Sequence, residues 1–235
     1  MTEADAHLGL ANRLATPFAR AVFLAYPIRG RDAPKYRIVG RPVPRSHMGA
    51  SREQSRERFG LPADAPVLAV FGGLAGAQAL NELAAETWGR SGPAVLHVAG
   101  ERDYDAARAK VERKDYVLLP TTDDFGAALA VADLALSRAG GTVWELAAAG
   151  TPSILVPYPH ATADHQALNA RYFEDGGGAI VVDQNDLGRV PALVEELLGD
   201  AGRLGRMSAA MRALAKPNAA DEIADELMLL ARERK

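Results

Sequence analysis

The chain has 235 residues, of which 48% are hydrophobic and 24% charged, and its net charge is −3 at pH 7. This composition is typical of a globular protein with a sizeable core, and no basic stripe indicates a nucleic-acid partner. The absence of cysteine excludes disulfides and thiolate metal sites, no apolar run reaches the roughly 18 residues of a membrane span, and the charged start MTEADAHLGLANR is not a signal peptide.

The first 45 residues differ from the rest of the chain. Their charged start shows no strand pattern. A helix is predicted within LGLANRLATPF, followed by a short strand at AVFLAY and a loop with another short strand. One helix and one or two strands cannot enclose a core, so residues 1–45 are interpreted as the end of a further domain and a linker.

From about residue 66 onward, apolar runs alternate with amphipathic segments, which predicts an α/β fold, a doubly wound parallel sheet whose strand order cannot be read from the pattern. Strands are expected at 66–73, 94–100, 115–120, 133–139, 152–158 and 178–182. Helices are expected at 77–90, 103–113, 123–132, 141–150 and 163–177, and then between 186 and 232 with breaks at Gly199, Gly202 and Pro217.

Two strand-to-helix turns are candidate anion sites. In VFGGLAGAQALN, Gly72, Gly73 and Gly76 let the backbone approach a phosphate at a helix N-terminus, although such glycines also serve tight packing. In SRAGGTVWE, Thr142 has a hydroxyl for a phosphate and Glu145 has a carboxylate for ribose hydroxyls; alternatively, Glu145 complements the helix dipole.

A third polar stretch, PYPHATADHQALNA, brings His160, Asp164, His165, Gln166 and Asn169 to a loop and the start of a helix. Neutral amides such as Gln166 suit sugar hydroxyls, whereas zinc spacing is absent and capping or solvation explains the histidines equally well. No G-x-S-x-G elbow is present, so a Ser-His-Asp hydrolase is not indicated.

Together with GLANR, GRPVP, HVAGERDY and GGAIVVDQNDL, these stretches resemble the MurG family of bacterial glycosyltransferases from residue 2 onward. That family transfers N-acetylglucosamine from its UDP derivative (UDP-GlcNAc) to the undecaprenyl-linked muramyl-pentapeptide of peptidoglycan synthesis. Its fold is GT-B, two Rossmann-like domains facing across a cleft. The resemblance implies a remnant of the acceptor domain with the linker at 1–45 and a donor-binding Rossmann-like domain at 46–235.

The resemblance also implies residue roles. The two glycine turns hold the diphosphate, Thr122 meets the uracil through its backbone, Glu145 binds the ribose, and His165 and Gln166 lie near the sugar. Asp5 falls where the family usually has the asparagine of its HEQN motif. The implied donor-binding set is Gly72, Gly73, Leu74, Gly76, Thr122, Gly141, Thr142, Val143, Glu145, His165, Gln166, Asp5 and Arg45. No cofactor or metal is implied, because backbone donors and helix dipoles replace a cation.

This sequence departs from the family pattern in three places. Leu74 replaces a serine of the first turn, Pro44 stands where an arginine is usual so that Arg45 or Arg41 supplies the charge, and the 140–142 turn is one residue shorter. The family's general base, membrane-facing acceptor surface and membrane contact belong to the N-terminal domain. The chain is therefore expected to be a donor half, inactive alone, that works at the cytoplasmic face of the inner membrane.

Two other interpretations stay open. The first is a stand-alone UDP-sugar-binding subunit that needs a separate acceptor and membrane partner. The second is another GT-B enzyme, such as a sugar-nucleotide epimerase or a secondary-metabolite glycosyltransferase, because Leu74 and Pro44 depart from the pattern.

Overall fold

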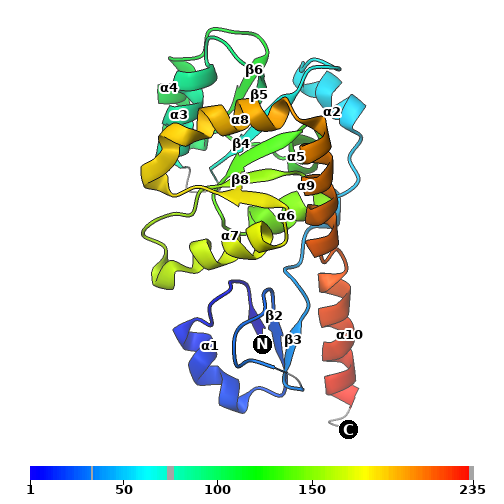
Figure 1. The fold of residues 1–235 in the computed structure, drawn as a ribbon. Coiled ribbons are helices and arrows are strands. Elements are labelled where there is room, and N and C mark those ends of the chain that lie inside the picture. The colour runs from blue at the N-terminus through cyan, green and yellow to red at the C-terminus, as the bar shows by residue number, and fades with distance from the viewer. Residues whose placement is uncertain (33, 73–76, 233–235) are drawn as a thin grey trace.

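The structure, a computed structural model, describes residues 1–32, 34–72 and 77–232. These residues form two parallel sheets (Figure 1). The larger sheet has the order β6-β5-β4-β7-β8-β9, and the smaller has the order β1-β2-β3. The strands of the larger sheet are β4 (Val67–Phe71), β5 (Ala94–Val98), β6 (Tyr116–Leu119), β7 (Leu134–Ser137), β8 (Ser153–Leu155) and β9 (Ala179–Val181). The predicted α/β class and these six strands are confirmed.

Helices connect successive strands of the larger sheet and continue beyond it. The α-helices are α1 (Leu10–Ala15), α2 (Arg52–Phe59), α3 (Gln78–Trp88), α4 (Glu101–Arg108), α5 (Phe125–Ala130), α6 (Thr142–Ala149), α7 (His165–Asp175), α8 (Val190–Leu198), α9 (Ala201–Leu214) and α10 (Ala219–Arg232). Short 3-10 helices are η1 (Thr16–Phe18), η2 (Arg45–His47), η3 (Thr162–Asp164) and η4 (Gln184–Arg189).

The larger sheet is buried on both faces, and strand β4 shows why. Its five residues are all buried, and they alternate between two cores. Leu68 and Val70 pack with the apolar faces of α3 and α8, while Ala69 and Phe71 pack with those of α5, α6 and α7. A parallel strand covered on both sides reads as a continuous apolar run, which is why the sequence pattern identifies these strands.

The smaller sheet consists of β1 (Thr2–Glu3), β2 (Val22–Leu24) and β3 (Tyr36–Ile38), all parallel. The sequence pattern predicts no strand at the start of the chain. This prediction is wrong, because Thr2 and Glu3 pair with Phe23 and Leu24. Helix α10 returns to this sheet (Figure 1), where Ile223 packs against buried Phe23. The last helix thus covers the first sheet.

The expected helix break at Gly202 is also wrong. Gly202 is the second residue of α9, which begins at Ala201 and is capped by Asp200, whose carboxylate accepts a hydrogen bond from the Arg203 N–H (2.8 Å). A glycine at this end of a helix costs less than one in its middle because the first N–H groups have no intrahelical partner in any case. Only the Gly199 and Pro217 regions separate the three last helices.

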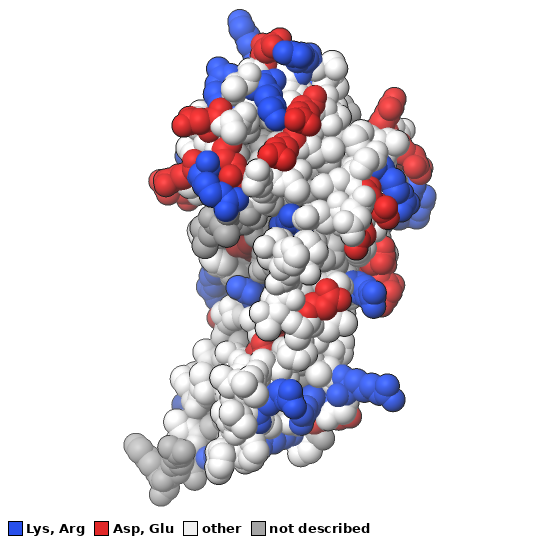
Figure 2. Space-filling view, turned by 90° about the vertical axis from the view of Figure 1, so that its left-hand side faces the viewer, with Lys and Arg blue, Asp and Glu red and all other residues white. Residues whose placement is uncertain are grey.

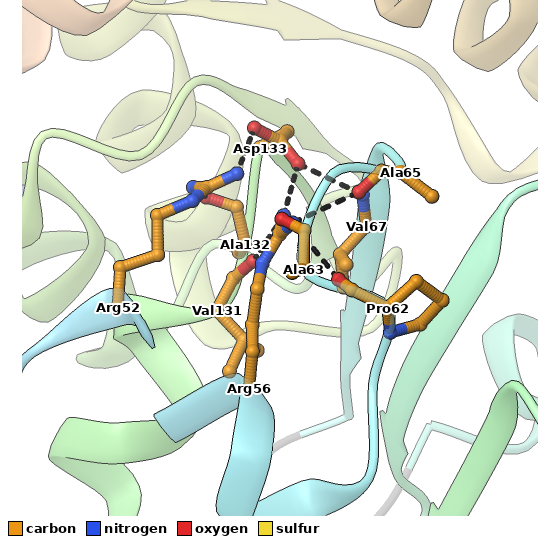
Figure 3. A network of polar contacts seen from close by, with 9 residues as sticks. All are labelled: Arg52, Arg56, Pro62, Ala63, Ala65, Val67, Val131, Ala132 and Asp133. Atoms are coloured by element: carbon orange, nitrogen blue, oxygen red, sulfur yellow. Dashed lines mark hydrogen bonds and ion pairs between the residues drawn. The ribbon is translucent and has the colours of Figure 1, made fainter. Parts of the chain in front are cut away.

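Helix α2 is attached to the amino ends of the strands by a buried arginine (Figure 3). The Arg56 guanidinium donates to the carbonyls of Pro62 and Ala65 (3.1 and 3.0 Å), to that of Val131 (3.2 Å), and to Asp133 Oδ2 (2.7 Å). It also donates to the carbonyl of Ala63. Burial lowers the pKa of Arg56. This cluster lies at the opposite edge of the sheet from the candidate site.

The surface charges of both signs are mixed. On the face shown in Figure 2, lysine and arginine side chains lie among aspartates and glutamates over the larger part of the molecule. Among the described residues, no helix is long and apolar enough to cross a membrane.

Candidate functional site

The strand order places a topological switch point between β4 and β7. The chain leaves β4 toward α3 and leaves its neighbour β7 toward α6, and these helices lie on opposite faces of the sheet. Ligands of doubly wound sheets bind at such a point, in the crevice outside the carboxyl ends of the strands. Gly72 follows β4 there. Gly73, Leu74 and Gly76, which the sequence assigns to this turn, lie outside the described residues.

The second turn leads directly into α6. Gly141 is the N-cap residue of this helix, and no side chain caps it, while the N–H groups of Val143 and Trp144 donate to the carbonyls of Gly140 and Gly141 (3.3 and 3.1 Å). The Val143 side chain is fully buried in the core, so only its backbone can face a ligand. Thr142 and Glu145 are partly exposed one turn apart.

An arginine of the linker covers this turn. A Cβ atom on Gly141 would lie 2.7 Å from Cζ of Arg41, so the guanidinium rests directly on the glycine. The preceding Gly40 has a φ of +82° and packs against Lys216 and Trp144, which directs the linker across α6. Arg41 therefore supplies a positive charge at the N-terminus of α6, where an anion is favoured.

The other arginine considered, Arg45, has a different partner. Its guanidinium donates to both carboxylate oxygens of Asp221 at the start of α10 (3.1 and 2.9 Å), and the Arg45 side chain is 83% exposed. The structure thus brings Arg41, and not Arg45, onto the Gly141–Thr142 turn.

Glu145 has a partner that the sequence did not reveal. Nδ1 of His47, in η2, lies 2.7 Å from Oε1 of Glu145, and both side chains are largely buried. The His47 ring lies edge-on to Phe125 (5.4 Å between centroids), which in turn contacts Phe71 at the end of β4 (5.1 Å). These contacts place the candidate ribose carboxylate beside the switch point.

Thr122 lies in the loop between β6 and α5. Its Oγ1 accepts a hydrogen bond from the Asp124 N–H (3.2 Å), and the Asp124 carboxylate caps α5 by accepting from the Ala127 N–H (3.1 Å). Asp124 is also paired with Arg58. Because Phe125 follows directly, the loop that carries Thr122 is anchored next to the His47–Glu145 pair.

The loop between β8 and α7 carries the candidate sugar contacts. Ala163 and Asp164 have positive φ values of 53° and 54° immediately before α7 begins at His165. Such a backbone is costly for residues other than glycine and occurs at functional sites. Gln166 Oε1 accepts from the Tyr158 N–H (3.0 Å), which leaves its amide nitrogen as a donor, while His165 Nδ1 donates to the Thr162 carbonyl (2.8 Å).

Asn169, one turn further along α7, joins the N-terminal segment to this edge. Its Nδ2 donates to Asp5 Oδ1 (3.0 Å) and to the Ala139 carbonyl (3.2 Å), and its Oδ1 accepts from the Ala6 N–H (2.8 Å). Asp5 is therefore held beside the start of α7. The contact connects the small sheet's first loop with the glycine turn after β7.

Two buried groups hold the same edge together. The Arg138 guanidinium donates to the carbonyls of Val156 and Pro157 (both 3.2 Å) and to Gln184 Oε1 (2.6 Å), and burial lowers its pKa. The Tyr26 ring lies 5.2 Å from that of Trp144 in α6, and burial raises the pKa of this tyrosine. Arg138 thus joins the segments that follow β8 and β9, and Tyr26 joins the end of β2 to α6.

No cluster of three or more metal-ligating side chains occurs within residues 1–32, 34–72 and 77–232. The class of protein that this fold defines is a Rossmann-like α/β domain with its crevice at the switch point between β4 and β7.

Comparison with known proteins narrows this class. Residues 67–225 match the Glycosyltransferase family 28 C-terminal domain. Two relatives are each named UDP-N-acetylglucosamine–N-acetylmuramyl-(pentapeptide) pyrophosphoryl-undecaprenol N-acetylglucosamine transferase. The Rubrobacter xylanophilus protein is 38% identical over 96% of this chain and 68% of its own length. The Mycolicibacterium smegmatis protein is 39% identical over 98% of this chain and 62% of its own length.

A solved structure agrees. The crystal structure of Acinetobacter baumannii MurG matches with a TM-score of 0.77 and 28% identity, over 97% of this chain and 65% of that chain. The chain therefore belongs to glycosyltransferase family 28, and its larger sheet corresponds to the family's C-terminal domain. The chain spans between 62% and 68% of the length of these three proteins.

Proposed function

We propose that this chain is the donor-binding half of an N-acetylglucosaminyltransferase that transfers N-acetylglucosamine from UDP-GlcNAc to an undecaprenyl-pyrophosphoryl muramyl-pentapeptide. The names of the relatives support the reaction, and their 38% and 39% identity extends over nearly the whole chain. The acceptor is lipid-linked, so the proposed place of action is the cytoplasmic face of the bacterial inner membrane.

The observation that carries the proposal is the arrangement around α6. Thr142 and Glu145 lie one turn apart at its start, at the switch point, and Arg41 rests on Gly141 beside them. The start of α6, which no side chain caps, and the Arg41 guanidinium favour a diphosphate, and a carboxylate one turn further can accept from both ribose hydroxyls. The same donors would stabilise the UDP leaving group as its charge develops.

The remaining candidates extend this arrangement along the donor. The loop of Thr122 is proposed to contact the uracil, and the amide nitrogen of Gln166 to donate to a sugar hydroxyl. His165 and Asp5 lie with Gln166 near the start of α7. Gly72 and the turn after it complete the proposed diphosphate contacts.

Transfer also requires a general base that removes the proton of the acceptor hydroxyl. We assign none to the described residues. We propose that the base and the acceptor surface belong to the part of the relatives' length that the matched region does not include, whether joined to this chain or supplied by a partner.

Titration calorimetry of this chain with UDP and UDP-GlcNAc tests the donor site. Wild type is expected to bind both, with UDP-GlcNAc bound more tightly because Gln166 adds a sugar contact. Glu145→Ala is expected to weaken both about tenfold, which is about 1.4 kcal/mol, and Gln166→Ala should weaken only UDP-GlcNAc. Arg90→Ala, which removes an exposed pair with Glu112, is the control. A folded chain that binds neither ligand would refute the proposal.

A further inference from the structure

Glu145 and His47 form a contact that joins two distant parts of the chain. Nδ1 of His47 lies 2.7 Å from Oε1 of Glu145, and the side chains are only 24% and 18% exposed. An ionised carboxylate can only accept hydrogen bonds, so Nδ1 of His47 carries the proton that makes this bond. Within the described part of the chain, Oε2 of Glu145 has no hydrogen-bond partner.

The position of His47 is fixed from several sides. The carbonyl oxygen of Ser46 would lie 2.4 Å from a Cβ atom on Gly126, so η2 packs directly on the backbone of α5. The His47 N–H donates to the Pro44 carbonyl (2.9 Å), and the ring contacts Phe125. A histidine held by backbone packing and a ring contact can impose its orientation on a flexible glutamate, while the reverse is less effective.

Fixing His47 also fixes Oε2 of Glu145, the carboxylate oxygen that His47 does not bind. A glutamate on a helix surface samples several rotamers, and ordering it on binding reduces affinity. Holding Oε1 by a charge-assisted hydrogen bond leaves Oε2 in place for a second donor. The linker that carries Arg41 to Gly141 thus also carries His47 to Glu145.

We propose that His47 is a positioning residue that fixes the Glu145 carboxylate for the ribose hydroxyls and thereby sets the preference of the site for ribonucleotides. The inference rests on the proposed donor function, because it assumes that Glu145 meets the ribose. It assigns His47 no contact with the ligand, so its effect on binding passes entirely through Glu145.

The test compares UDP with 2′-deoxy-UDP on the full chain by titration calorimetry. We define the ribose discrimination as the Kd of 2′-deoxy-UDP divided by the Kd of UDP. Wild type is expected to discriminate about tenfold or more, because the analogue lacks the 2′-hydroxyl that donates to the Glu145 carboxylate. His47→Ala should reduce the discrimination about three- to tenfold and change the Kd of 2′-deoxy-UDP less than about twofold.

Three further variants separate positioning from a general structural effect. His47→Asn keeps a side-chain N–H near the place of Nδ1 and should restore most of the discrimination. In a Glu145→Ala background, where discrimination is expected to be about one, His47→Ala should have no further effect on it. Arg90→Ala is the surface control, and thermal unfolding confirms that each variant is folded.

The outcomes distinguish this inference from the proposed function. If the folded wild-type chain does not bind UDP, the donor function is refuted and the role of His47 with it. If UDP binds but His47→Ala leaves the discrimination unchanged, the inference alone is refuted. It is also refuted if His47→Ala raises the discrimination, because His47 would then compete with the ribose for Glu145.

Discussion

Replacing Arg56 is expected to destabilise the chain far more than replacing Arg52, although both arginines pair with the same carboxylate. The Arg56 side chain is 4% exposed and the Arg52 side chain 46%, while that of Asp133 is 25% exposed. Arg56→Ala removes the bond to Asp133 and leaves the carbonyls of the α2–β4 loop without their donor. Breaking a buried pair costs about 3 to 5 kcal/mol, whereas an exposed pair is worth about 1 kcal/mol or less.

The lower end of that range is expected for Arg56→Ala, because Asp133 keeps Arg52 and the Val67 N–H (2.8 Å) as donors. Urea unfolding followed by circular dichroism gives the loss in free energy of unfolding for Arg52→Ala and for Arg56→Ala. In thermal unfolding, a chain of this size with Arg56→Ala should melt about 6 to 12 °C lower than wild type. UDP affinity should not change, because the cluster lies at the opposite edge of the sheet. Equal losses for Arg52→Ala and Arg56→Ala would refute the argument that burial decides the contribution.

Three more outcomes are expected. Arg41→Ala should weaken UDP binding about tenfold, whereas Arg45→Ala, whose arginine is held by Asp221, should change it less than about twofold; equal effects in calorimetry would contradict the assignment of Arg41. Burial lowers the pKa of His97 to about 3 from 6.5, so only the unfolded chain takes up this proton between those pH values, and stability falls as the pH drops below about 6.5. Between pH 6.5 and 5 wild type should therefore lose about 1.6 kcal/mol more than His97→Gln in urea unfolding, and equal losses would refute this. In Gly126→Ala, the new Cβ would lie 2.4 Å from the Ser46 carbonyl oxygen, so the variant should lose about 1 to 3 kcal/mol of stability and have a lower ribose discrimination. An unchanged discrimination would show that the packing of η2 does not hold His47.

The larger sheet could be predicted from the sequence because its strands are buried on both faces. Each strand is a short apolar run that ends in a glycine, a proline or a polar residue, so pattern alone locates it. The sequence also predicts that Thr142 and Glu145 share one face, because residues three positions apart on a helix are neighbours on its surface. What the pattern could not provide was the strand order, which depends on long-range packing.

The features that were missed depend on partners distant in sequence. His47 and Glu145 are 98 positions apart, and no spacing rule connects them. Arg41 and Arg45 are indistinguishable in the sequence, but the left-handed turn at Gly40 and the pairing of Arg45 with Asp221 separate them. The two-residue strand β1 exists only because β2 lies beside it.

Helix α10 has a consequence for the order in which the chain folds during synthesis. Phe23 and Val39 are covered by Ile223 and Leu230, and Arg20 donates to the Leu230 carbonyl across 210 positions. A ribosome adds about 5 to 20 residues per second, so the first sheet waits on the order of 10 to 40 s for the helix that covers it. The smaller sheet is therefore synthesised well before the helix that completes it, and the apolar side chains of Phe23 and Val39 lack this cover in the interval.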